Sequence, residues 1–121
     1  MNGVDTKTKQ ALILEADRVA ARPWERFGED EGVRYRTLWI EPGSRSYAGV
    51  LRLDSGAAIG HHTHRHASHH VWVADGDCRI DGRHLEAGSY VCVPAGVDHG
   101  VDAAGPQGCA LFYLYLREPG T

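Results

Sequence analysis

A histidine cluster constrains this 121-residue chain more than any other feature, because six of its eight histidines lie between His61 and His70. If this stretch is extended, side chains two residues apart point to the same face. His62 and His64 then form a pair of neighbouring imidazoles, a frequent arrangement of metal ligands. A second glycine-flanked block, Gly88 to His99, follows about a dozen residues after the first and can bring its own histidine to the same place.

The first block resembles the first signature motif of the cupin superfamily. In that motif a glycine is followed by a His-x-His pair, a glutamate and a second glycine. The matching positions in this chain are Gly56, His62, His64, His69 and Gly76. His69 stands where the family usually has the glutamate. Four residues separate it from His64, a spacing that is most similar to that of germins.

The second block resembles the second cupin motif, in which a glycine precedes Pro-x-Gly, a histidine and an asparagine. The matching positions are Gly88, Pro94, Gly96 and His99, and Ala103 replaces the asparagine. The resemblance covers residues 33–116. Within the superfamily, the chain is similar to small stand-alone cupin domains, including the metal-binding domain of zinc-dependent anti-sigma factors.

Short apolar runs separated by turn residues predict, independently of the motifs, an all-β sandwich or barrel. The ligand-bearing strand begins near Ile59, and Asp81-Gly82 predicts a hairpin. Further strands are expected at residues 33–40, 46–53, 70–74, 88–93 and 109–116. The turn residues Asp75-Gly76 are expected to end the strand at 70–74. In the first run, alternation assigns one face to Val33, Tyr35, Thr37 and Trp39. The cupin resemblance implies a jelly-roll barrel, the double-stranded β-helix.

The length allows one domain with a single core. We expect an N-terminal polar segment with an edge strand at residues 1–32, the cupin barrel at 33–116 and a tail at 117–121. The apolar run at residues 11–14 is interpreted as that edge strand, with a helical turn as the alternative.

The last apolar run, residues 109–116, is hydrophobic on both faces. A strand of a two-layer barrel that is apolar on both sides needs cover on its outer face. A homodimer is the simplest source of that cover. Cys92 is expected to be a small buried side chain, and the aromatic strand residues can belong either to the core or to a pocket around the histidines.

Composition argues against several partner classes. The formal net charge of -3 provides no basic surface for nucleic acid or an anionic membrane. No basic-apolar leader opens the chain and no apolar run approaches the roughly 18 residues of a membrane span, so we expect a cytoplasmic protein. Its three cysteines are odd in number and widely spaced, which favours reduced thiols.

The resemblance implies that His62, His64, His69 and His99 bind a divalent transition metal. Imidazole suits Mn, Fe, Co, Ni, Cu and Zn, so the ligands do not select among them. Four imidazoles leave two open positions on an octahedral metal but close a tetrahedral zinc site. His66 falls in the connecting loop of the germin-like register, whereas His61, His70 and His84 are expected to face outward.

Two functions of different classes follow from such a centre. The first is a metal-dependent enzyme. Dioxygenase-type oxidoreductase chemistry is the favoured reaction type, and isomerase or lyase chemistry comes second. Its substrate would be a small molecule that chelates the metal, such as an enol or enolate, a diketone, a catechol-like compound or a hydroxy acid. The alternative is a non-enzymatic sensor or regulatory module that binds a metal or ligand, and a storage or scaffold role comes third.

Overall fold

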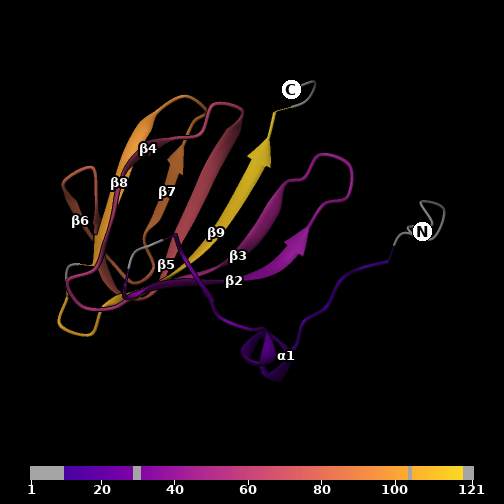
Figure 1. Ribbon diagram of the computed structural model, residues 1–121, viewed down its shortest axis with the longest axis horizontal. Helices are drawn as coiled ribbons and strands as arrows, with labels where there is room; N and C mark the ends of the chain where they lie inside the picture. The colour runs from indigo at the N-terminus through magenta and orange to yellow at the C-terminus, as the bar shows by residue number, and fades with distance from the viewer. Residues whose placement is uncertain (1–9, 29–30, 104, 119–121) are drawn as a thin grey trace.

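The computed structural model describes residues 10–28, 31–103 and 105–118, with only the backbone described for His61. Parts of the expected N-terminal segment and C-terminal tail therefore lie outside the described residues. Within them the chain forms one short helix and nine strands (Figure 1). The elements are α1 (Ala16–Ala21), β1 (Glu25–Arg26), β2 (Val33–Ile40), β3 (Tyr47–Leu53), β4 (Ala58–Thr63), β5 (Ala67–Ile80), β6 (Arg83–Glu86), β7 (Tyr90–Val93), β8 (Asp98–Ala103) and β9 (Cys109–Arg117).

The strands form two antiparallel layers that share the long strand β5. Residues 67–76 of β5 pair with β9, which continues through β3 and β2 to β1, and β7 pairs along the other side. Residues 77–80 of β5 pair instead with β6 and β8, and β8 pairs with β4. This arrangement confirms the expected all-β jelly-roll barrel, and the two layers face each other in Figure 1.

The core fills the space between the two layers. Alternate side chains of β3 and β9 are buried, as the two-residue period of a strand requires. Each fully buried Val, Leu or Ile side chain contributes about 1.5–3 kcal/mol of transfer free energy. The buried aliphatic residues include Leu51, Leu53, Ile59, Val71, Val73, Ile80, Val101 and Leu111.

A glycine allows β5 to pass from one layer to the other. Gly76 has a φ of 71°, and a Cβ at this position would lie 2.1 Å from the carbonyl oxygen of Gly108. The ladder with β9 also shifts register between Val73 and Asp75. The expected end of the strand at Asp75-Gly76 is therefore wrong, because the bulge and the positive φ bend the strand without ending it. The expected hairpin is confirmed at Asp81-Gly82, where Ile80 pairs with Arg83.

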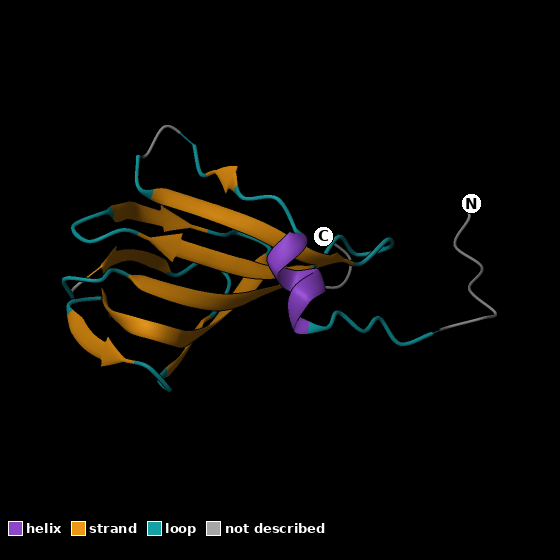
Figure 2. Cartoon of the chain, turned by 90° about the horizontal axis from the view of Figure 1, so that it is seen from below, coloured by secondary structure: helices purple, strands orange, loops and turns teal. Residues whose placement is uncertain are grey.

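The described chain before β1 lies on the outer side of the sheet rather than in it (Figure 2). Residues 11–14 are neither a strand nor a helical turn, which corrects the expected edge strand, and helix α1 follows them. Leu12 and Leu14 instead border an apolar groove with Leu38. Arg36 donates a hydrogen bond to the carbonyl oxygen of Val19 at 2.8 Å and so holds α1 against β2 (Figure 2).

A bulge in β2 corrects the predicted face of Trp39. The pairing of β2 with β3 shifts between Thr37 and Trp39, so that Trp39 lies opposite Ala48. Because a shift of one residue exchanges the two faces of a strand, Trp39 lies beside Leu38 on the outer side. Ile40 takes the inward position and lines the central cavity.

Within the described residues, no helix is long and apolar enough to cross a membrane.

Candidate metal centre

The two histidine blocks meet on neighbouring strands at one end of the barrel. His62 on β4 lies directly opposite His99 on β8, with ring centroids 4.3 Å apart. His64 follows the end of β4, and its carbonyl oxygen accepts a hydrogen bond from the backbone N–H of Gly96 at 2.8 Å. The Pro-x-Gly turn of the second block thus holds the backbone of the first.

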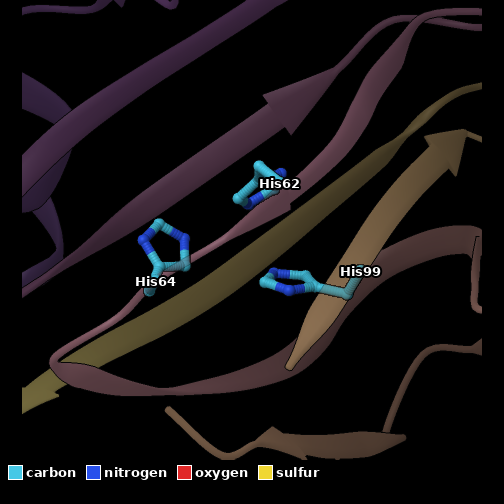
Figure 3. Close-up of side chains that lie close together, drawn as sticks. All are labelled: His62, His64 and His99. Carbon is cyan, nitrogen blue, oxygen red and sulfur yellow. The ribbon is translucent and has the colours of Figure 1, made fainter. Parts of the chain in front are cut away.

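Three of the four expected ligands form one compact group. Each of His62, His64 and His99 offers one ring nitrogen, and these atoms all lie within 4.8 Å of one another. Figure 3 shows the three rings gathered between their strands. His99 is fully buried, whereas His62 and His64 are partly buried. A group of three imidazoles open on one side can hold a transition metal and leave room for a ligand.

His69, the fourth expected ligand, lies beside this group on β5. It is buried, and its Nδ1 is 3.1 Å from Nε2 of His99. The ring of Tyr115 stacks on the His69 ring at a centroid distance of 4.2 Å and an angle of 7°. The His69 ring also lies 5.5 Å from that of His64, centroid to centroid. His69 therefore adjoins the group of three without belonging to it, and its role as a ligand stays a prediction.

Backbone carbonyl groups orient two of the histidines. Nδ1 of His62 lies 2.9 Å from the carbonyl oxygen of Gly60, and Nδ1 of His99 lies 3.4 Å from that of Val97. When Nδ1 donates its proton to a carbonyl, the lone pair of a neutral imidazole is on Nε2. A hydrogen bond from one ring nitrogen to a backbone carbonyl, with the other nitrogen free for the metal, is typical of histidines that bind metals.

The environment favours the neutral form of His64, His69 and His99. Burial, together with the imidazoles of His62 and His99, lowers the pKa of His64 to about 4. Burial and the neighbouring His99 lower the pKa of His69 to about 3, and burial also lowers the pKa of His99. A histidine must be neutral to bind a metal. The imidazole donor set therefore fits a divalent transition metal, and the lowered pKa values of His64, His69 and His99 favour the form that binds it.

The remaining described histidines lie outside the cluster. His70 faces the other side of β5, where its Nδ1 is 2.6 Å from the hydroxyl of Tyr90. His66 is exposed in the loop before β5. His84 is exposed and contacts the carboxylate of Asp77 at 2.7 Å. The expected orientation of the His61 side chain falls outside the described residues.

A cavity of about 550 Å³ opens beside the cluster and includes His62 and His69 in its wall. Four of the aromatic residues on the described strands line this cavity. The four are Tyr35, Tyr47, Tyr113 and Tyr115. The side chain of Cys92 is exposed, so the expected buried position is wrong. On β7 it pairs opposite His70, whose side chain faces away from the cluster.

Sequence reasoning missed two kinds of site residue. Tyr115 was an undecided aromatic, yet its hydroxyl is 2.7 Å from Nε2 of His64. Three arginines, Arg26, Arg45 and Arg117, line the cavity and were not considered as site residues. The alternation of Tyr113, Tyr115 and Arg117 along β9 was the available signal, because residues two apart share a face.

A two-layer β-barrel with a histidine cluster inside one end defines a cupin domain. The chain belongs to the ChrR cupin-like domain family, whose model matches residues 15–117. No curated protein matches the chain significantly.

Solved structures support the same fold. An RmlC-like cupin from Shewanella frigidimarina NCIMB 400 is 27% identical with a TM-score of 0.68, and the match covers 84% of this chain and 88% of that one. An acetylacetone dioxygenase from Acinetobacter johnsonii is 18% identical with a TM-score of 0.71, covering 90% and 75%. The anti-sigma ChrR of Rhodobacter sphaeroides, in complex with SigE, is 24% identical with a TM-score of 0.63, covering 75% and 46%.

Proposed function

We propose that this cupin is a metal-dependent enzyme of the dioxygenase type that acts on a small chelating enolate, diketone or hydroxy acid. The observation that carries the proposal is the junction of the histidine cluster with a cavity of about 550 Å³, whose wall includes His62 of the cluster and the neighbouring His69. A purely structural metal site needs no such space, whereas a cavity of this size is typical of small-molecule sites.

The proposed centre uses His62, His64, His69 and His99 as ligands. The pKa values of His64, His69 and His99 are lowered, which favours the neutral form that binds metal at neutral pH. A divalent transition metal bound there would supply Lewis acidity and, if it is redox-active, electron transfer between substrate and O2.

The chain's own residues would position and protect the substrate. Buried aliphatic side chains such as Leu51, Val71 and Leu111 form the inner wall and exclude water. Burial raises the pKa of Tyr115 far above its ordinary value, so its hydroxyl keeps its proton at neutral pH. A protonated hydroxyl beside His64 can donate a hydrogen bond to a substrate oxygen.

Two measurements test the proposal. The first is elemental analysis of untagged protein purified without added metal, and the second is oxygen uptake with a panel of β-diketones and hydroxy acids. We expect a stoichiometric redox-active metal and substrate-dependent consumption of O2. Four-coordinate zinc with no oxygen uptake would contradict the enzyme.

That second result would favour a regulatory module that senses a metal or ligand. The family match and the likeness to the anti-sigma ChrR support this alternative. A protein of that kind needs a partner whose binding changes with the state of the site. The match covers 46% of the ChrR chain, so it does not extend this relative's partner to the present chain.

We also propose that the protein is a cytoplasmic homodimer. Side chains on the outer face of β5, β7 and β9 support the dimer because they form a contiguous apolar surface. Trp72 is 39% exposed and Phe112 38%, and their rings lie 6.0 Å apart, while Tyr90 packs on Trp72 at 4.9 Å. Exposed apolar clusters of this kind commonly mark protein interfaces. The three free cysteines suit a reducing compartment.

A further inference from the structure

The opening of the cavity is built differently from its interior. Arg45 and Arg117 are exposed residues of its wall, whereas the inner wall is apolar and buried. They come from neighbouring segments, because Arg45 lies in the loop between β2 and β3 and Arg117 ends β9. The backbone N–H of Arg117 donates to Oγ of Ser46 at 3.0 Å, and Figure 1 shows this loop beside the end of β9.

The charged residues of the cavity wall all carry positive charge. The described residues that line the cavity include three arginines and no aspartate or glutamate. Within the described residues no carboxylate forms an ion pair with Arg45 or Arg117, in contrast to Arg34, which contacts Asp54 at 3.2 Å. A planar guanidinium that faces a cavity without a carboxylate partner is suited to bind an anionic oxygen group.

A row of aromatic rings connects the opening with the histidines. Tyr47 lies opposite Tyr115 across the β3–β9 ladder, with ring centroids 4.8 Å apart. Tyr115 in turn contacts His64 and stacks on His69. Burial raises the pKa of Tyr47, and the charge of Arg117 opposes this rise, as expected if the guanidinium lies near the Tyr47 hydroxyl. From its opening inward, the cavity is therefore lined first by arginines, then by tyrosine rings and finally by histidines.

We propose that the cavity binds a small carboxylate with a planar or apolar body, whose carboxylate lies at Arg45 and Arg117 and whose other end points toward the histidine cluster. The tyrosine rings provide the flat surface for the body, and the guanidiniums form charge-assisted hydrogen bonds with the carboxylate. The role of the histidine end rests on the proposed function, but the contacts at the arginines need no metal. The two arginines therefore favour acids over neutral diketones as substrates.

Benzoate and benzamide are suitable probes because they share a planar body and differ in charge. Each is titrated into metal-free protein by calorimetry. We expect benzoate to bind about tenfold more tightly than benzamide or better. The double variant Arg45→Gln/Arg117→Gln should lose this preference, whereas Arg79→Gln, an exposed arginine outside the cavity wall, should keep it. Equal affinities in the wild type, or a preference that persists in the double variant, would overturn the inference.

The salt dependence of the wild type gives a second measurement that needs no variant. Raising the salt concentration from about 50 to about 500 mM should weaken benzoate binding and leave benzamide binding unchanged, because salt screens exposed charges. Equal salt responses would contradict an arginine site. Metal content, measured in parallel, separates the two proposals. Protein that never binds a metal but prefers benzoate disproves the metal-dependent enzyme and supports the anion site.

Discussion

Tyr115 lies flat on His69, with the two rings 4.2 Å apart and 7° from parallel, and the same tyrosine places its hydroxyl 2.7 Å from Nε2 of His64. The two residues are direct partners in the β5–β9 ladder. One aromatic side chain therefore fixes the rings of two expected ligands that come from different parts of the first histidine block. The strand pairing, rather than a local motif, creates this contact.

Tyr115→Phe isolates the hydroxyl from the ring. The phenylalanine keeps the stack on His69 but removes the contact with His64, so the His64 ring becomes less restricted. We expect metal affinity to fall about tenfold, the lower end of the range for lost outer contacts at metal sites. Tyr35→Phe is the matched control, because Tyr35 lines the cavity without a contact to these histidines. Identical metal affinities for the two variants, measured by competition with a chelator, would refute a positioning role.

Acid should destabilise the metal-free protein. The folded-state pKa values of about 4 for His64 and about 3 for His69 lie below the value of about 6.5 for an unfolded histidine. Between these limits the unfolded chain binds protons that the folded chain does not. The free energy of unfolding therefore falls as pH decreases below about 6.5, and this loss levels off below the folded-state pKa values.

Urea denaturation of the metal-free protein at about pH 7 and about pH 5 measures this effect. We expect a lower free energy of unfolding at the acidic pH. The double variant His64→Asn/His69→Asn should lose less stability over the same interval, because it lacks the two displaced titrations. A wild type and a variant with the same pH dependence would show that these histidines are not held neutral.

The dimer proposal predicts a specific sensitivity to charge on the outer sheet face. Light scattering at micromolar concentration should report a dimer for the wild type and a monomer for Trp72→Glu, because the substitution places an unpaired charge in the apolar face. Val97→Glu is the control, since Val97 is 43% exposed in the loop before β8, away from that face. A monomeric wild type, or a dimeric Trp72→Glu variant, would count against this interface.

The sequence was sufficient to predict the barrel and the meeting of His62, His64 and His99. Two motifs in order determine the pairing of β4 with β8, and strand alternation then brings the rings together. It was insufficient where a single-residue irregularity changes the period. The bulge before Trp39 exchanges the faces of β2, and Gly76 bends β5 at an Asp-Gly pair that is locally identical to a turn signal.

The opening of the cavity could not be predicted because it combines segments far apart in the chain. Arg45 lies in a loop whose position depends on the hydrogen bond from Arg117 to Ser46. No local pattern marks such a residue as part of a site. Tyr115 and Arg117 could have been placed on the face of Tyr113 by alternation, but their contact with the cavity depends on how the two layers close.

His69 provides the most direct test of the four-histidine centre, because it replaces the glutamate of the cupin motif and lies beside His99 and His64 without belonging to the compact group of three. Metal titrations of His69→Ala and His70→Ala compare neighbouring histidines on opposite faces of β5. We predict that His69→Ala weakens metal binding by at least about tenfold, whereas His70→Ala leaves the affinity unchanged. Equal affinities for the two variants would contradict the four-histidine centre.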